Sequence, residues 1–91
     1  MIQSFRDKDA RLLHEREFSR RLQGVEKTAR IRLALLEAAT SLGDLRLPGL
    51  RLEPLAGDRS GQHSIRINDQ FRICFRWHDG HAHDVEIVDY H

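Results

Sequence analysis

Three side chains that can carry or transfer protons stand in a row after an apolar run: Asp89, Tyr90 and His91. An imidazole has an unperturbed pKa of about 6.5 and exchanges protons at neutral pH. A carboxylate can accept a proton or orient the imidazole, and an arginine such as Arg72 can stabilise charge that develops on phosphorus. These groups suit metal-free RNA cleavage, in which a base takes the 2′-hydroxyl proton and an acid protonates the leaving oxygen. The alternative is an ordinary strand end on which Tyr90 packs as an amphipathic aromatic.

The composition is that of a small globular domain. The 91 residues are 40% hydrophobic and 32% charged, so we expect a single domain over residues 1–91. No apolar run approaches the ~20 residues that cross a bilayer, and the first residues lack the apolar stretch of a signal peptide. The single cysteine, Cys74, excludes an internal disulfide. These features predict a cytoplasmic protein without membrane contact.

The balance of charge is less informative than the kind of cation. With 15 Lys+Arg against 14 Asp+Glu, net charge argues neither for nor against a nucleic-acid partner. Lysine occurs only at Lys8 and Lys27, so almost all positive charge is arginine. The planar guanidinium donates two parallel hydrogen bonds and is the better ligand for phosphate. The composition is therefore compatible with an RNA partner bound by local arginines.

The first half of the sequence predicts two helices. Residues 7–22 are rich in Arg, Glu, Leu and Ala with few apolar positions, which is typical of a polar, mostly exposed helix. Residues 25–41 carry an apolar stripe at helical spacing and lead to Gly43, a residue type that commonly ends helices. The stripe consists of Val25, Ala29, Leu33, Leu36 and Ala39. Before both helices, residues 2–5 alternate and predict a short strand.

The second half predicts an antiparallel meander. Residues 62–67 and 71–77 each alternate apolar with polar side chains, as half-buried strands do. For the two apolar sets to share one face, Ile67 must oppose Phe71, with residues 68–70 as the loop between them. A two-residue turn would shift the register by one residue and place the apolar side chains of the second strand on the opposite face of the sheet.

A further turn centred on residues 78–80 leads into the last strand. Pairing Phe75 with Val85 and Ile73 with Ile87 keeps the apolar face continuous across the sheet. We expect that face to rest on the helices. The fold class is then α+β, with N-terminal helices packed on one face of an antiparallel sheet.

The opposite face of this sheet is expected to be polar. Its members by alternation are Arg66, Arg72, Arg76, Glu86 and Tyr90. Arg66 and Arg72 lie directly opposite each other in the predicted register, and like charges there are destabilising unless an anion lies between them. Glu86 or a phosphate could supply that anion. The alternative interpretation is a solvated surface without a ligand.

Other chemistries are weakly indicated. His78, His81 and His83 cluster around one turn, but no Cys or carboxylate is spaced as in known zinc sites. Cys74 stands in mid-strand without an obvious base, which is typical of a packing residue. Residues 57–61 contain two glycines but lack the Lys-Ser/Thr of a phosphate-binding loop. We therefore expect neither a metal site nor a cofactor.

The segments "LEPLAGDRSGQHSIRINDQFRICFRWHDG" and "VEIVDYH" resemble the HigB-type toxins of the RelE/ParE superfamily, from bacterial type II toxin-antitoxin operons. The resemblance is dense over residues 45–91 and extends loosely to "MIQSFRDK". It implies a RelE-like fold and an mRNA endonuclease that enters the ribosomal A site and cuts without metal. It also implies neutralisation by a HigA-like helix-turn-helix antitoxin, through which alone the toxin would reach operator DNA.

Carried over position by position, the resemblance places the catalytic residues at Arg72, Asp89, Tyr90 and His91. Tyr90 would stack on an unpaired base or donate a proton. The other arginines that we expect to contact RNA are Arg51, Arg59, Arg66 and Arg76.

The sequence departs from the family pattern before its Gly-Asp-Arg motif. Glu53 and Ala56 stand where many relatives have a histidine and a lysine. Glu53 could replace the histidine as a base, although a carboxylate beside a phosphate is electrostatically unfavourable. Two alternatives to the ribonuclease stay open: a ParE-like gyrase poison, and a non-cleaving toxin that binds antitoxin and regulates its operon. In the second case, Ala56→Lys would raise toxicity.

Overall fold

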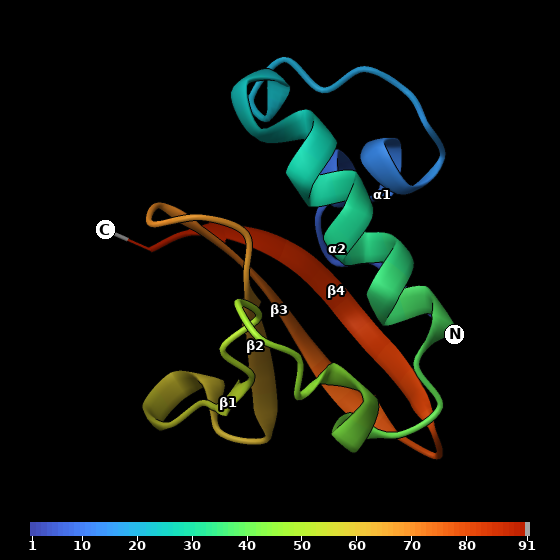
Figure 1. The fold of residues 1–91 in the computed structure, drawn as a ribbon, viewed down its shortest axis with the longest axis vertical. Helices are drawn as coiled ribbons and strands as arrows, with labels where there is room; N and C mark the ends of the chain where they lie inside the picture. The colour runs from blue at the N-terminus through green and yellow to red at the C-terminus, as the bar shows by residue number, and fades with distance from the viewer. Residues whose placement is uncertain (91) are drawn as a thin grey trace.

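Four antiparallel strands form one sheet in the order β1-β2-β3-β4, and two helices lie against one of its faces (Figure 1). A computed structural model of the chain describes residues 1–90. The helices are α1 (Lys8–His14) and α2 (Glu26–Ala38), and the strands are β1 (Glu53–Pro54), β2 (Gln62–Arg66), β3 (Phe71–His78) and β4 (His81–Asp89). Three short 3₁₀ helices complete the elements: η1 (Gln23–Val25), η2 (Leu42–Leu45) and η3 (Gly57–Arg59). The predicted α+β class with helices on one face is confirmed.

The predicted register between β2 and β3 is confirmed. Ile65 pairs with Ile73, and the amide of Ile67 donates to the carbonyl of Phe71 at 2.9 Å. The Asn68 side chain closes the intervening loop by accepting from the amides of Gln70 and Phe71, at 2.9 and 2.7 Å. Asparagine stabilises turns in this way because its short amide reaches backbone donors two or three residues ahead.

The predicted pairing of Ile73 with Ile87 is confirmed, whereas at Phe75 the register shifts, so that Phe75 lies opposite Asp84 and Val85 together and not opposite Val85 alone. Cys74 pairs with Glu86 but Arg76 pairs with His83, so β4 carries one extra residue. The extra residue forms a β-bulge at Asp84, whose φ is +52°. The bulge lets Val85 stay buried while the polar residues on either side keep the outer face.

The predicted helix over residues 7–22 is wrong beyond its first half. α1 ends at His14, and Arg16 follows with φ +62°, a left-handed turn that a continuous helix cannot contain. Ser19 and Leu22 are buried in the irregular stretch that follows, because it packs back onto the helices. The predicted second helix is confirmed and spans Glu26–Ala38.

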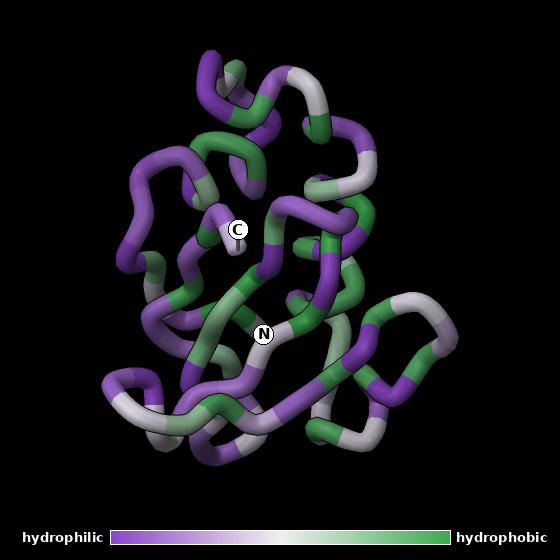
Figure 2. The backbone as a smooth tube through the Cα atoms, turned by 90° about the vertical axis from the view of Figure 1, so that its left-hand side faces the viewer, coloured by the Kyte–Doolittle hydropathy of each residue, from purple (hydrophilic) through white to green (hydrophobic). Residues whose placement is uncertain are grey.

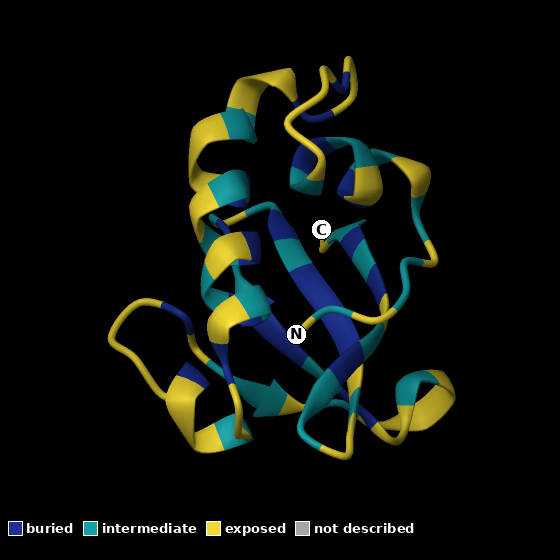
Figure 3. Ribbon diagram, turned by 90° about the vertical axis from the view of Figure 1, so that its right-hand side faces the viewer, coloured by how far each residue is buried: buried dark blue, intermediate teal, exposed yellow. Residues whose placement is uncertain are grey.

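One hydrophobic core lies between the helices and the inner face of the sheet. Burial is concentrated in the strand centres and on the sheet-facing side of α2, as Figure 3 shows. Hydrophobic and hydrophilic segments follow one another at short intervals along the chain in Figure 2, as expected for elements with one apolar side. The largest fully buried hydrophobic side chains of this core are Phe75, Leu13, Leu22, Leu33, Leu36, Leu45, Leu50, Ile65, Ile73 and Val85. The predicted N-terminal strand is reduced to two isolated parallel bridges, Ile2 to Ala82 and Phe5 to Val85.

A polar network joins the start of α1 to β4. Asp7 caps α1 by accepting from the amide of Asp9 at 2.9 Å, and its other oxygen accepts from the amide of Ile87 at 3.0 Å and from Arg21 at 2.7 Å. Arg21 also donates to Asp9, and this hydrogen bond, helped by one from Ser19, lowers the pKa of Asp9. A lowered pKa in the folded state contributes stability at neutral pH that is lost as pH falls through that pKa.

Asp7→Ala is expected to lower the free energy of unfolding by about 2 kcal/mol, because it removes a helix cap, takes one acceptor from Arg21 and leaves the amide of Ile87 without the Asp7 carboxylate. Urea denaturation at pH 7 measures this. Asp58→Ala, at an exposed position of η3, is the matched control and should change stability by less than about 0.5 kcal/mol. Equal effects of the two substitutions would contradict a structural role for the network.

Among residues 1–90, no helix has the length and apolar character needed to cross a membrane.

Candidate functional site

The sheet face that points away from the helices gathers the predicted site residues. Cross-strand pairing places Ser64 beside Cys74 and Arg66 beside Arg72, and Glu53 of β1 pairs with Ser64. These residues alternate with the core residues Ile65 and Ile73 and therefore lie on the outer face. We call this surface the arginine face, and it comprises Glu53, Arg59, Gln62, Ser64, Arg66, Arg72, Cys74, Arg76, Glu86 and Tyr90.

Arg72 has the least exposed side chain among the arginines of the arginine face. Its Nη1 donates to Oε1 of Glu53 at 2.9 Å and to Oγ of Ser64 at 3.0 Å. The guanidinium carbon lies 5.3 Å from the centre of the Tyr90 ring, within the range of a cation–π contact. The Arg72 side chain is only 16% exposed, whereas Glu53 and Tyr90 are about half exposed. A fixed guanidinium next to an accessible carboxylate and an accessible ring is the strongest site-like geometry on this face.

Arg59 enters the same face from η3. Its Nη1 donates to Oε1 of Glu86 at 2.6 Å and to Oε1 of Gln62 at 3.1 Å. The hydrogen bond to Glu86 raises the pKa of Arg59 above its ordinary value, against the opposing effect of burial. Arg59 is therefore charged, but Glu86 largely neutralises it.

The sequence suggested Glu86 as an anion between the opposed Arg66 and Arg72, but other carboxylates pair with these two arginines. Arg66 and Arg72 are cross-strand neighbours as predicted. Glu86, however, binds Arg59, while Arg72 takes Glu53 and Arg66 forms an ion pair with Asp69. Each carboxylate lies close to one guanidinium, so the repulsion between the two arginines is relieved within the chain.

The other two predicted RNA-binding arginines are more open to solvent. Arg51 is exposed, adopts φ +48°, and makes no side-chain hydrogen bond or ion pair within residues 1–90. Arg76 is exposed and its Nε lies 3.8 Å from Asp84 of the bulge. The glycine at position 61 has φ +91°, and an added Cβ there would come within 2.9 Å of Arg76 Nη1. Gly61 therefore gives Arg76 the room to lie against this loop.

Two of the three predicted proton carriers, Asp89 and Tyr90, lie on opposite faces of the sheet. Asp89 pairs with Phe71, which places it on the core side of the sheet, where its Oδ2 accepts from the side-chain Nε2 of Gln70 at 3.0 Å. Tyr90 follows on the opposite face and lies against Arg72. His91 is outside the described residues. The structure thus brings Tyr90 to Arg72 and sets Asp89 at the edge of the other face.

Glu53 is the site residue whose place sequence reasoning did not find. The sequence singled it out only as the replacement for a histidine, whereas the structure sets its carboxylate on Arg72. β1 is only two residues long, which is too short for an alternating pattern that would predict a strand. Its departure from the family pattern was the one available signal.

Cys74 and the histidines at the β3–β4 turn, His78 and His83, take no visible part in a site. Cys74 is fully buried beneath the arginine face, and burial raises the pKa of its thiol, which disfavours the nucleophilic thiolate. The rings of His78 and His83 lie 6.0 Å apart at the β3–β4 turn. Within the described part of the chain, no three or more His, Cys, Asp or Glu side chains are grouped so that they could hold a metal ion.

Comparison with known proteins identifies relatives of this chain. Residues 3–91 match the family described as RelE-like toxin of type II toxin-antitoxin system HigB. The chain is 36% identical over 93 residues to Endoribonuclease HigB of Proteus vulgaris, covering 100% of both chains. It is 39% identical over 85 residues to Toxin HigB-1 of Vibrio cholerae, covering 90% of each.

A solved structure supports the same fold. The YoeB-YefM complex from Staphylococcus aureus contains a chain that superposes with a TM-score of 0.60 at 17% identity, covering 100% of this chain and 98% of that one. A likeness at this identity bears on the fold alone, and it confirms the predicted RelE-like fold. The family resemblance found in the sequence is confirmed as well. The chain belongs to the HigB-like family of RelE-like toxins from type II toxin-antitoxin systems.

Proposed function

We propose that this toxin is a metal-independent endoribonuclease that cuts mRNA on the ribosome and so blocks translation. The observation that carries the proposal is the fixed Arg72, held by Glu53 and Ser64 and covered by the Tyr90 ring. A phosphate ligand, a proton acceptor and an aromatic surface for a base meet there. A full-length relative named Endoribonuclease HigB supports the same reaction.

Arg72 is suited to bind the scissile phosphate without losing its present partners. A guanidinium has five N–H donors, and the contacts with Glu53 and Ser64 both use Nη1. The donors on Nε and Nη2 are left for two phosphate oxygens, within the part of the chain that the structure describes. In the reaction, the 2′-oxygen loses its proton and bonds to phosphorus, the 5′-oxygen leaves with a proton, and a 2′,3′-cyclic phosphate remains. Arg72 would stabilise the phosphorane charge between these events.

The proton carriers divide between the two faces. Tyr90, beside Arg72, would stack on an unpaired base or donate the proton to the leaving oxygen. His91 follows directly in sequence and is the second candidate for the acid. Asp89, on the other face, would act by orienting the terminal residues.

Glu53 is our candidate for the base that accepts the 2′-hydroxyl proton. Its carboxylate oxygen is 2.9 Å from Arg72 Nη1, so a phosphate bound by Arg72 brings the neighbouring ribose within its reach. The side chain is 46% exposed and open to substrate. Glu53 occupies the position at which many relatives have a histidine. Its contact with the Arg72 guanidinium offsets the repulsion between the carboxylate and the phosphate.

Glu53→Gln should lower the rate of cleavage by about 10²- to 10⁴-fold, because glutamine keeps the hydrogen bond to Arg72 but accepts no proton. The readout is the single-turnover rate of RNA cleavage at pH 7. Glu86→Gln is the matched control on the same face and should cleave at the wild-type rate. Wild-type cleavage by Glu53→Gln would assign the base to another group.

The remaining arginines would grip the RNA backbone around this centre. Arg66 lies beside Arg72, and Arg51 and Arg76 are exposed to solvent. Arg59 would contribute through the donors that Glu86 and Gln62 leave open. Phosphate contacts of this kind position a nucleic acid without reading its sequence.

The partners follow from the same proposal. As a member of a type II toxin-antitoxin family, the chain has an antitoxin partner. We propose that this partner is a HigA-like helix-turn-helix protein, that operator DNA is bound only through it, and that the toxin acts in the cytoplasm. Incubating purified toxin with mRNA alone and with mRNA in a translating extract tests the ribosome requirement. Cutting should occur only in the extract, and equal cutting of bare mRNA would overturn that requirement.

A further inference from the structure

The outer edge of β4 has two different kinds of partner along its length. β4 is an edge strand, so every second residue turns its N–H and C=O away from β3. At Val85 these groups meet the backbone of the N-terminal segment: the amide donates to the Ser4 carbonyl at 3.0 Å, and the carbonyl accepts from the Arg6 amide at 2.9 Å. At Asp7 the chain turns into α1, and this backbone pairing ends.

Two side chains continue the pairing at Ile87, two residues further along the edge. The Ile87 amide donates to Oδ2 of Asp7 at 3.0 Å, and the Ile87 carbonyl accepts from Nη2 of Arg21 at 3.2 Å. The same Nη2 donates to Oδ2 of Asp7 at 2.7 Å, so the two side chains also hold each other. An acceptor for the amide and a donor for the carbonyl are what a neighbouring strand would supply. We call Asp7 and Arg21 the edge clamp.

Both members of the edge clamp are themselves held in place. The second oxygen of Asp7 accepts from the Asp9 amide at 2.9 Å, and Nε of Arg21 donates to Oδ2 of Asp9 at 2.8 Å. The Asp7 side chain is only 15% exposed. The N–H donors of a guanidinium form a rigid fork, so two carboxylates and one carbonyl together fix its orientation.

The irregular segment after α1 makes this contact possible. Asp7 and Arg21 are 14 residues apart in the sequence. In a continuous helix that separation would place them about 21 Å apart along the axis. After the left-handed turn at Arg16, the chain returns to the start of α1, where Arg21 reaches both Asp7 and β4. A helix over residues 7–22 would therefore be incompatible with the edge clamp.

The edge clamp lies close in sequence to the candidate site. Ile87 precedes by three residues Tyr90, whose ring lies against Arg72. On the β3 side, the Tyr90 amide donates to the carbonyl of Gln70 at 2.6 Å, and the edge clamp holds the opposite side of the same strand end. The ends of strands open locally where few hydrogen bonds hold them. The place of the Tyr90 ring therefore depends on both sides of the strand.

We propose that the edge clamp positions the RNA-cleaving site, because its hold on Ile87 fixes the end of β4 and so keeps Tyr90 against Arg72. Asp7 and Arg21 are positioning residues in this proposal, and neither contacts RNA. The effect on cleavage rests on the proposed ribonuclease function, whereas the place of the Tyr90 ring can be measured without RNA.

The chain offers its own probe, because Tyr90 is its single tyrosine. Fluorotyrosine incorporated into the full-length toxin gives one fluorine NMR signal, which reports how the ring lies against Arg72. Arg21→Met removes the donors of the edge clamp and leaves Asp7 to cap α1. Arg21→Lys keeps a cation but loses the planar fork. Circular dichroism and urea denaturation check that each variant is folded.

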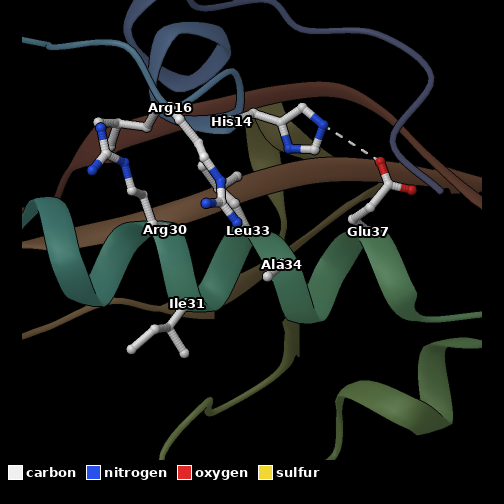
Figure 4. Close-up of a pocket in the computed structure, with 8 residues that line it drawn as sticks. His14, Arg16, Arg30, Ile31, Leu33, Ala34 and Glu37 are labelled. Atoms are coloured by element: carbon white, nitrogen blue, oxygen red, sulfur yellow. Dashed lines mark ion pairs between the residues drawn. The ribbon is translucent and has the colours of Figure 1, made fainter.

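Arg30→Met is the matched control. Arg30 lies on α2 beside a groove of about 450 Å³ on the helical side of the molecule (Figure 4). Like Arg21, it donates to a carboxylate and to a backbone carbonyl, those of Glu26 at 2.5 Å and Glu17 at 3.2 Å, and both lie outside β4. Arg72→Ala is the positive control for the fluorine signal, because it removes the cation next to the ring.

We expect the fluorine signal of Arg21→Met to move from its wild-type position towards that of the urea-unfolded protein. Arg21→Lys should lie in between, and Arg30→Met should keep the wild-type signal. The single-turnover cleavage rate of Arg21→Met at saturating ribosomes should fall about 10- to 100-fold, as for a reacting group misplaced by up to about 1 Å. The half-saturating ribosome concentration should stay unchanged. A purely structural role would lower stability without moving either readout.

A wild-type fluorine signal in folded Arg21→Met would overturn the proposal, because the edge clamp would then have no hold on Tyr90. A displaced signal with unchanged cleavage by an active toxin would overturn its part in the reaction. The fluorine measurement needs no RNA, so it decides the place of the Tyr90 ring even if the wild-type toxin cuts nothing. That last result would contradict the proposed function and not the edge clamp.

Discussion

Replacing Arg72 with alanine is expected to lower the rate of RNA cleavage by about 10²- to 10³-fold, the usual effect of removing one preorganised charge-stabilising donor. The side chain is held at its place by Glu53 and Ser64, so it needs little rearrangement to receive a phosphate. Its loss also leaves the Glu53 carboxylate without a counter-ion beside the incoming RNA. The lost phosphate ligand and the unpaired carboxylate both slow the same step, the attack of the 2′-oxygen on phosphorus.

The measurement is single-turnover cleavage of a translated mRNA, with growth arrest on induction as the cellular readout. Arg20→Ala, an exposed arginine on the helical side, is the matched control and should cut at the wild-type rate. Arg72→Lys keeps the charge but loses the planar fork, so we expect an intermediate rate. Wild-type activity in Arg72→Ala would remove Arg72 from the mechanism.

Phe75→Ala is expected to lower the free energy of unfolding by about 3–5 kcal/mol, the range found when a large aromatic is removed from a close-packed core. Phe75 has no exposed surface and lies in the central strand β3. Its ring stacks near His63 at 6.3 Å and meets the edge of Trp77 at 6.4 Å. A smaller side chain would leave a cavity in the core that the surrounding residues can fill only in part.

Urea denaturation of wild type and variant measures this loss directly. Phe18→Ala removes the same group from a position that is 62% exposed, and it should cost under about 0.5 kcal/mol. A loss below 1 kcal/mol for Phe75→Ala would mean that the core is loosely packed. Because the marginal stability of a small domain is about 5–15 kcal/mol, the expected loss would also reduce the amount of folded toxin in cells.

The pairing of the strands could be predicted wherever apolar and polar side chains alternate strictly along the sequence. Ile67 opposite Phe71 and Ile73 opposite Ile87 follow from the rule that apolar side chains share a face. The bulge was missed because the predicted pairing of the last strand was given only for Val85 and Ile87 and did not reach Asp84. The spacing of three residues between the buried Ala82 and Val85 was the signal for an extra residue.

In the first half of the chain, composition alone did not predict where the first helix ends. Residues 15–22 are rich in helix formers, yet tertiary contacts override that preference: Ser19 is buried and bonds Asp9, and Leu22 enters the core. The stripe of the second helix was decisive because periodic burial, unlike propensity, fixes which side faces the sheet.

The candidate site was predictable as a set of side chains but not as a set of contacts. The arginine face follows from strand alternation. The choice of carboxylate partner does not, because it depends on the course of the chain between η2 and β2, which has no periodic pattern. Glu53 reaches Arg72 through a two-residue strand, and Arg59 reaches Glu86 through the η3 turn. Long-range pairs of this kind become visible only in the folded chain.

The most direct test of the account is primer extension on a cellular mRNA after induced expression of wild type, Arg72→Ala and Glu53→Gln. We expect wild type to arrest growth and to produce cuts within the coding region, and we expect both substitutions to remove the cuts and restore growth. Growth arrest by wild type without cleavage of any mRNA would contradict the ribonuclease proposal and point to a different target.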